Sequence, residues 1–274
     1  MDGSIGFSWD VSRVDTRWTD GEGQGLRMLG EPRPKGLPAA LARHGSVRSF
    51  VLRTLYSWFT LTILFTFTWP LLVVYFDAPA VSIDETPLDW FQVRFLLLLL
   101  TAIAAGWLWW VSPAPVEVAN PERFTALFRR GKAWPQAIVF LVGLSLLLAL
   151  LLVLENPAGG GKVVAFGLVE AALIQVLLAG YMQSFFELVL DDARSYLASL
   201  GLFALTFAIR GGLASTTQDD LGQDLFVVAL LAGAVVGLVA GGLSLFLRAR
   251  SGSIVPAVFV YWLLFSILPA LFEG

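Results

Sequence analysis

Charged residues are scarce in this chain, and cysteine is absent altogether. Lys, Arg, Asp and Glu make up 14% of the 274 residues, whereas a soluble domain carries roughly a quarter. Without cysteine the chain forms neither a disulfide framework nor a thiolate metal site. The single histidine, His44, lies in a polar N-terminal segment, where we interpret it as a solvated side chain. A zinc site would then depend on carboxylates alone, which zinc rarely accepts, so we expect no metal and no other cofactor.

Strong positive charge is also missing, which bears on the partners of the chain. The formal net charge is −3 and the isoelectric point is about 5.2, and both argue against nucleic acid as a partner. The first residues contain no apolar stretch of the kind that a secretory signal peptide needs. We therefore expect no cleavable signal peptide and expect the first membrane span to act as its own insertion signal.

Long apolar runs dominate what is present. Apolar residues make up 57% of the chain, the mean hydropathy is +0.76, and most charges lie between the apolar runs. Most runs are long enough to cross a hydrocarbon layer about 30 Å thick. The sequence therefore predicts an all-α fold, a polytopic transmembrane helical bundle of about seven spans in the lipid bilayer. The predicted spans are Val51–Phe76, Phe95–Val111, Ala137–Leu154, Val163–Leu190, Ser195–Ile209, Leu225–Leu247 and Ile254–Phe272.

The distribution of basic residues predicts the orientation of these spans. If the N-terminus is cytoplasmic, all Lys and Arg residues except Arg94, Lys162 and Arg210 fall on the cytoplasmic side. Such an excess is typical of cytoplasmic loops and sets orientation in the membrane. We therefore expect a cytoplasmic N-terminus, an extracytoplasmic C-terminus and a multi-pass location in the cell inner (plasma) membrane.

The composition divides the chain into three parts. Residues 1–48 form a polar cytoplasmic tail, which is either disordered or ordered on a partner that its Trp9 and Trp18 contact. Residues 49–162 hold three spans, and residues 163–274 hold four. The Asn-Pro-Glu sequence that begins at Asn120 is typical of a helix start. It predicts a short amphipathic helix on the membrane surface near residues 120–132, with an ordinary polar loop as the alternative.

Charged and small residues inside the spans suggest specific contacts. Glu170 lies in the fourth span and Arg210 near the outer end of the fifth, at similar depth in two consecutive antiparallel spans. An unpaired charge there costs several kcal/mol, so we predict an ion pair, with a proton- or substrate-handling carboxylate as the alternative. Gly233, Gly237 and Gly241 form a repeated small-residue face on the sixth span. We expect this face to pack against a helix of the same chain, and a homodimer contact is the alternative.

Three segments carry a resemblance to a known family. The segment Gly241–Val258 combines a glycine-rich helix with a Ser-Gly-Ser-Ile-Val-Pro turn, and the segments Gln175–Met182 and Leu202–Phe207 precede it in the family's order. Together they resemble the CAAX-protease and bacteriocin-processing (CPBP, also called Abi) family over roughly residues 165–270. The resemblance implies the helical core of an intramembrane glutamate-dependent protease.

The residues that the resemblance would make catalytic are replaced in this chain. Apolar or uncharged side chains stand at the family's paired glutamates, its arginine and its two histidines: Ile174 and Gln175, Ala179, and Phe207 and Tyr261, respectively. These side chains cannot activate water as a carboxylate and histidines do. We expect Gln175, Ala179, Phe207 and Tyr261 to converge in a dry, filled region, with Gln175 the nearest partner for the Tyr261 hydroxyl.

The sequence thus favours a catalytically inactive CPBP-like protein that serves as a scaffolding or accessory subunit. Its partners would be other membrane protein subunits. One alternative is a divergent intramembrane protease that uses Glu170 as its carboxylate. Another is a transporter or lipid-handling protein, for which the candidate lining residues are Glu170, Gln175, Gln183 and Arg210.

Overall fold

The protein is a bundle of long apolar helices. The computed structural model describes residues 47–79, 81–111, 136–190, 192–216, 223–251 and 253–273, and within these ranges the regular elements are all helical. Seven of the helices are long and apolar enough to cross a membrane, as the sequence predicts. A helix suits such a chain because it satisfies every backbone polar group internally, where no water is available to do so.

The first three spans and the fifth and sixth are single α-helices, and the fourth and seventh each contain a π-helical segment. The single helices are α2 (Val47–Phe76), α3 (Leu88–Val111), α5 (Gln136–Glu155), α8 (Asp192–Thr216) and α9 (Gln223–Ser251). The fourth span comprises α6 (Gly160–Ile174), η2 (Gln175–Met182) and α7 (Gln183–Val189). The seventh comprises α10 (Val255–Trp262), η3 (Leu263–Ile267) and α11 (Leu268–Glu273). Pro269 lies two residues after the end of η3, and the wider π turn accommodates a residue that has no N–H and whose ring crowds the preceding turn.

The two largest differences between the predicted and the observed helix ends each move an arginine into a span. Helix α3 begins at Leu88 rather than at Phe95, so Arg94 lies inside a span and not in an outer loop. Helix α8 continues beyond Arg210 to Thr216, so Arg210 is an internal residue of the fifth span. A prediction from hydropathy alone ends a helix where the apolar run ends. It therefore misses the helical turns that lie beyond a charged residue, when the protein stabilises that charge inside the span.

Two further predictions concern the N-terminal part of the chain. Helix α2 begins at Val47, so the polar tail ends two residues earlier than the boundary at residue 48. The remainder of the tail and the amphipathic helix near residues 120–132 lie outside the described residues.

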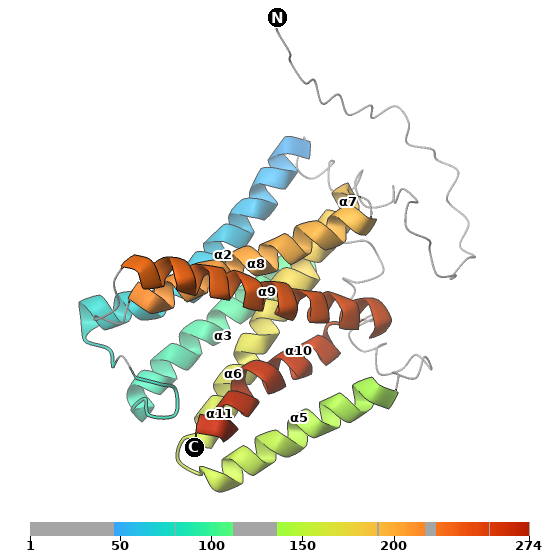
Figure 1. The fold of residues 1–274 in the computed structure, drawn as a ribbon. Helices are drawn as coiled ribbons and strands as arrows, with labels where there is room; N and C mark the ends of the chain where they lie inside the picture. The colour runs from blue at the N-terminus through green and yellow to red at the C-terminus, as the bar shows by residue number, and fades with distance from the viewer. Residues whose placement is uncertain are drawn as a thin grey trace, which may run out of the picture.

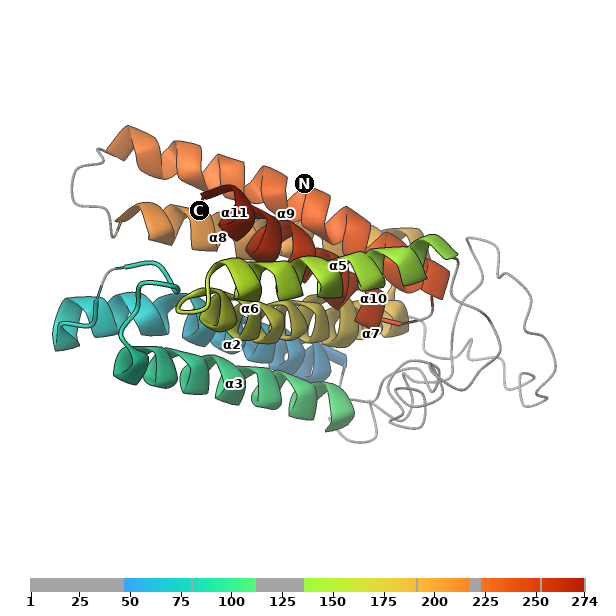
Figure 2. The same cartoon turned by 90° about the horizontal axis from the view of Figure 1, so that it is seen from below.

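The fourth span is the centre of the bundle. Half of its most apolar stretch is buried, a larger share than in any other described span. Helices α3, α5, α8, α9 and α10 contact it, and α9 also packs along α8 (Figure 1). The C-terminus lies at the same end of the bundle as the end of α2 and the start of α3 (Figure 2). We call this end the C-terminal end.

Helices α8 and α9 form the most extensive helix pair, and glycines make it possible. A Cβ atom built on Gly233 or Gly237 would lie 2.3 Å or 2.5 Å from a backbone carbonyl oxygen of α8, and one on Gly241 would lie 2.7 Å from the Phe203 side chain. Real side chains do not approach so closely. The small-residue face of α9 is therefore used for packing within the chain, as expected, rather than for a homodimer.

We predict that Gly237→Ala lowers the stability of the detergent-solubilised protein by about 1–3 kcal/mol, because the added methyl group forces the α8 and α9 backbones apart. The matched control is Gly143→Ala in α5, where an added Cβ meets no atom within 4 Å. Thermal unfolding followed by circular dichroism measures the difference. Equal melting temperatures for the two variants would contradict the packing described here.

Candidate functional site

The positions that the family resemblance singles out lie together in the centre of the protein. Ile174 ends α6, Gln175 and Ala179 belong to η2, Phe207 lies on α8 and Tyr261 on α10. All five side chains are buried, and the four apolar or aromatic ones belong to a single core cluster. The fourth, fifth and seventh spans therefore contribute to one core cluster.

Aromatic rings fill this region. The ring centroids of Phe207 and Tyr261 are 6.0 Å apart, and Phe265 lies 4.6 Å from Tyr261 and 6.2 Å from Phe207. Rings at such distances pack edge to face or in tilted pairs and leave little free volume between them. The three rings therefore pack directly against one another.

The Gln175 amide nitrogen and the Tyr261 hydroxyl have partners other than each other, whereas the buried Gln175 Oε1 has no hydrogen-bond partner among the described residues. Gln175 Nε2 donates a hydrogen bond of 2.8 Å to Ser244 Oγ of α9, which joins the fourth span to the sixth. The Tyr261 hydroxyl interacts with the guanidinium of Arg210 and not with Gln175, the partner expected from the sequence. The reason is that Arg210 is internal to α8, so its long side chain reaches the level of Tyr261.

Glu170 and Arg210 form the ion pair that the sequence predicts. Arg210 Nη2 lies 2.5 Å from Glu170 Oε1, with 29% and 17% of the respective side chains exposed. The Arg210 guanidinium also lies over the Phe65 ring, 4.5 Å from its centroid. The pair joins α6 to α8 and is enclosed by α2, so two opposite charges compensate each other among apolar helices.

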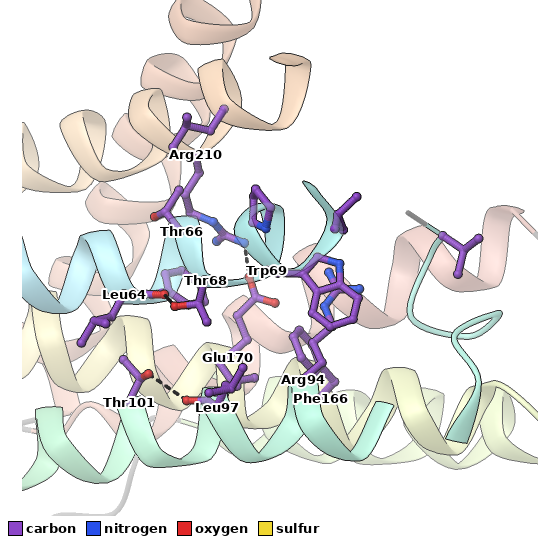
Figure 3. A pocket seen from close by; sticks show the side chains of 16 residues that line it. Leu64, Thr66, Thr68, Trp69, Arg94, Leu97, Thr101, Phe166, Glu170 and Arg210 are labelled. Atoms are coloured by element: carbon purple, nitrogen blue, oxygen red, sulfur yellow. Dashed lines mark hydrogen bonds and ion pairs between the residues drawn. The ribbon is translucent and has the colours of Figure 1, made fainter. Parts of the chain in front are cut away.

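A third charge belongs to the same region, and the sequence interpretation missed it. Arg94 of α3 interacts with both Glu170 and Arg210. The three residues line a cavity of about 360 Å³ between α2, α3, α6 and α8 (Figure 3). Pro87 before α3 and Asp89 in its first turn are typical helix-start residues, and they were the signal that Arg94 lies inside the span.

A second buried arginine lies near the opposite end of the bundle. Arg248, which the sequence analysis counted among cytoplasmic basic residues, is 6% exposed. Its Nη1 donates a 2.6 Å hydrogen bond to the Ala179 carbonyl of η2, and its Nη2 lies 3.3 Å from Glu187 Oε2 of α7. Arg248 shares a face of α9 with Gly241 and Ser244, at helical spacing, and this spacing was the signal that it turns inward.

The described residues contain no group of three or more His, Asp or Glu side chains that would hold a metal ion. Comparison with known proteins finds no matching family model, no matching curated protein and no matching solved structure. The fold itself defines the class: this chain is a multi-pass helical membrane protein.

We predict that Arg248→Met destabilises the protein by about 3–5 kcal/mol, because it removes the Arg248 contacts of the partly buried Glu187 carboxylate and of the Ala179 carbonyl. Arg250→Met is the control, since Arg250 is exposed on the same helix and its loss removes the same charge. Thermal unfolding in detergent should show a large shift for the first variant and a shift within about 1 kcal/mol for the second. Similar shifts for both would show that the Arg248 contacts contribute little.

Proposed function

We infer that this chain is a catalytically inactive, CPBP-like membrane protein that acts as a scaffolding or accessory subunit of a membrane protein complex. The observation that carries the proposal is the filled region around Ile174, Gln175, Ala179, Phe207 and Tyr261. A glutamate-dependent protease needs a carboxylate, basic groups and water at one place. Here that place holds a buried amide and packed aromatic rings.

The chemistry of the remaining polar groups supports the same proposal. The Gln175 amide neither accepts nor releases a proton at physiological pH. The Ser244 hydroxyl beside it contacts the amide nitrogen, which cannot act as a general base for a nucleophilic serine. In the proposed relationship the family's fold would persist without its catalytic groups, because apolar side chains such as Ile174, Ala179 and Phe207 need no hydrogen-bond partners.

The protease alternative depends on Glu170, and the contacts of Glu170 argue against it. Its carboxylate is paired with Arg210, so its negative charge is already used for a structural contact. A general base also needs a water molecule within hydrogen-bond reach and a scissile carbonyl nearby. The other ionisable side chains that line the cavity beside Glu170 are Arg94 and Arg210, and an arginine cannot serve as the acid–base partner that a histidine provides.

The proposed role places the chain in the inner (plasma) membrane beside other subunits. Apolar side chains cover the outward face of α9, including Val228, Leu231, Val235 and Val239, each more than half exposed. Lipid tails or an apolar helix of another subunit suit this face equally well. The polar segment of residues 1–46, with Trp9 and Trp18, is the second surface through which we expect a subunit to be contacted.

We predict that the full-length chain, purified from its native membrane in a mild detergent, elutes together with specific membrane proteins at a mass above that of one 29.8 kDa chain in its micelle. A membrane protein carrying the same tag is the control for nonspecific recovery. The double variant Trp9→Ala, Trp18→Ala should retain less of the partners. Recovery as a lone monomer, or peptide hydrolysis that Glu170→Gln abolishes, would contradict the proposal.

A further inference from the structure

The cavity between α2, α3, α6 and α8 has the position of a site that opens within the membrane. Arg94 lies six residues after the start of α3 and Arg210 six residues before the end of α8, which places both about 9 Å from the helix ends at about 1.5 Å per residue. Leu64 of α2 and Val81 of the loop before α3 line the cavity and are 48% and 39% exposed, so its rim is apolar and faces outward. A molecule in the bilayer therefore reaches the charged interior without crossing the core.

The charges around this cavity do not balance. Two guanidinium groups and one carboxylate line it, and arginine remains protonated at every physiological pH. Arg210 is matched by its contact with Glu170. The charge interactions of Arg94 with the described residues involve only this same pair. One positive charge is therefore left over among apolar walls, where an uncompensated charge is costly.

The geometry of Arg94 shows which part of its side chain is available. Its guanidinium lies over the Trp69 ring, 4.5 Å from the ring centroid, and 5.2 Å from the centroid of Phe166 (Figure 3). These contacts occupy the faces of the planar group and leave its in-plane N–H donors unused. Among the described residues the buried Nη1 has no hydrogen-bond partner. In-plane donors of arginine match the oxygens of a carboxylate or phosphate.

The rest of the cavity lining consists of threonine hydroxyl groups among mostly apolar side chains. Thr66 lines the cavity, and its buried Oγ1 is also without a hydrogen-bond partner in the described structure. Thr101 differs, since its hydroxyl donates to the Leu97 carbonyl one turn earlier. Most other lining side chains are aliphatic or aromatic. The site thus combines one spare cation, one spare hydroxyl and an apolar surround.

We propose that this cavity binds the oxyanion headgroup, a phosphate or a carboxylate, of a singly charged anionic amphiphile from the bilayer. Arg94 donates its in-plane N–H groups to the headgroup oxygens and Thr66 donates its hydroxyl. The Glu170–Arg210 pair forms the opposite wall, and the amphiphile's chain leaves over Leu64 and Val81. A single negative charge neutralises the excess of one positive charge, and the volume of about 360 Å³ suits a headgroup. The proposal is independent of whether the chain is a subunit of a complex.

Native mass spectrometry of the full-length protein tests this proposal. The probes are phosphatidylglycerol, phosphatidylcholine of the same chain length, oleate, and inorganic phosphate alone. Phosphatidylglycerol or oleate should remain bound as one tightly held molecule, and phosphatidylcholine should not. Arg94→Gln should weaken that binding by about ten-fold or more, because charged hydrogen bonds are lost. Arg250→Gln, which removes an exposed cation elsewhere, should leave it unchanged.

Two further variants keep the test decisive if Arg94→Gln does not fold. Arg94→Lys retains the charge but loses the planar fork, so it should bind several-fold more weakly. Glu170→Gln raises the excess charge, so it should bind at least as tightly as the wild type. Equal binding of phosphatidylglycerol and phosphatidylcholine, or loss of binding in Glu170→Gln with Arg94→Lys unaffected, would overturn the proposal. Arg94-dependent binding of inorganic phosphate alone, without amphiphile binding, would overturn the assignment to an amphiphile.

Discussion

The absence of water from the hydrocarbon core of a membrane is the constraint on which the rest of this structure depends. It requires each backbone polar group to find a partner inside the protein, which long helices provide. It also requires each charge within the spans to be compensated by the protein or by something bound to it. The helical bundle follows from the first requirement. The contacts of Glu170, Arg210, Arg94 and Arg248 follow from the second.

The two charged clusters differ in how completely they are compensated. Near the opposite end of the bundle, Arg248 is satisfied by the Ala179 carbonyl and the Glu187 carboxylate, and it fixes α9 to the fourth span. Near the C-terminal end, Glu170 is shared between two arginines, and a cavity adjoins them. Between the clusters lie Phe207 and Tyr261 in a packed, apolar core. We interpret the first cluster as structural and the second as the place where this protein meets a ligand.

The sequence predicted the parts of this structure that depend on local composition. Seven apolar runs identified the seven spans, and the equal depth of Glu170 and Arg210 in consecutive spans predicted their contact. The glycine spacing on α9 predicted close packing, although only the structure shows that α8 is the partner. Arg94 and Arg248 were missed because a charge at the edge of an apolar run was assigned to a loop by hydropathy. The cavity was beyond prediction from the sequence, since it depends on how α2, α3, α6 and α8 pack together. The resemblance to the CPBP family remains a prediction, on which the proposed role of the chain depends.

The chain contains no cysteine, which permits a direct test of the contrast between the dry core and the cavity. Single cysteines at Ala179 and at Thr68, a cavity-lining position, are exposed to a small, water-soluble thiosulfonate reagent in detergent-solubilised protein from which bound amphiphiles have been removed. Such reagents modify the thiolate, which forms where water is present or a cation is near. The account predicts modification of Thr68→Cys and protection of Ala179→Cys until the protein is unfolded. Rapid modification of Ala179→Cys in the folded protein would contradict it, because the buried region around Ala179 would then be open to water.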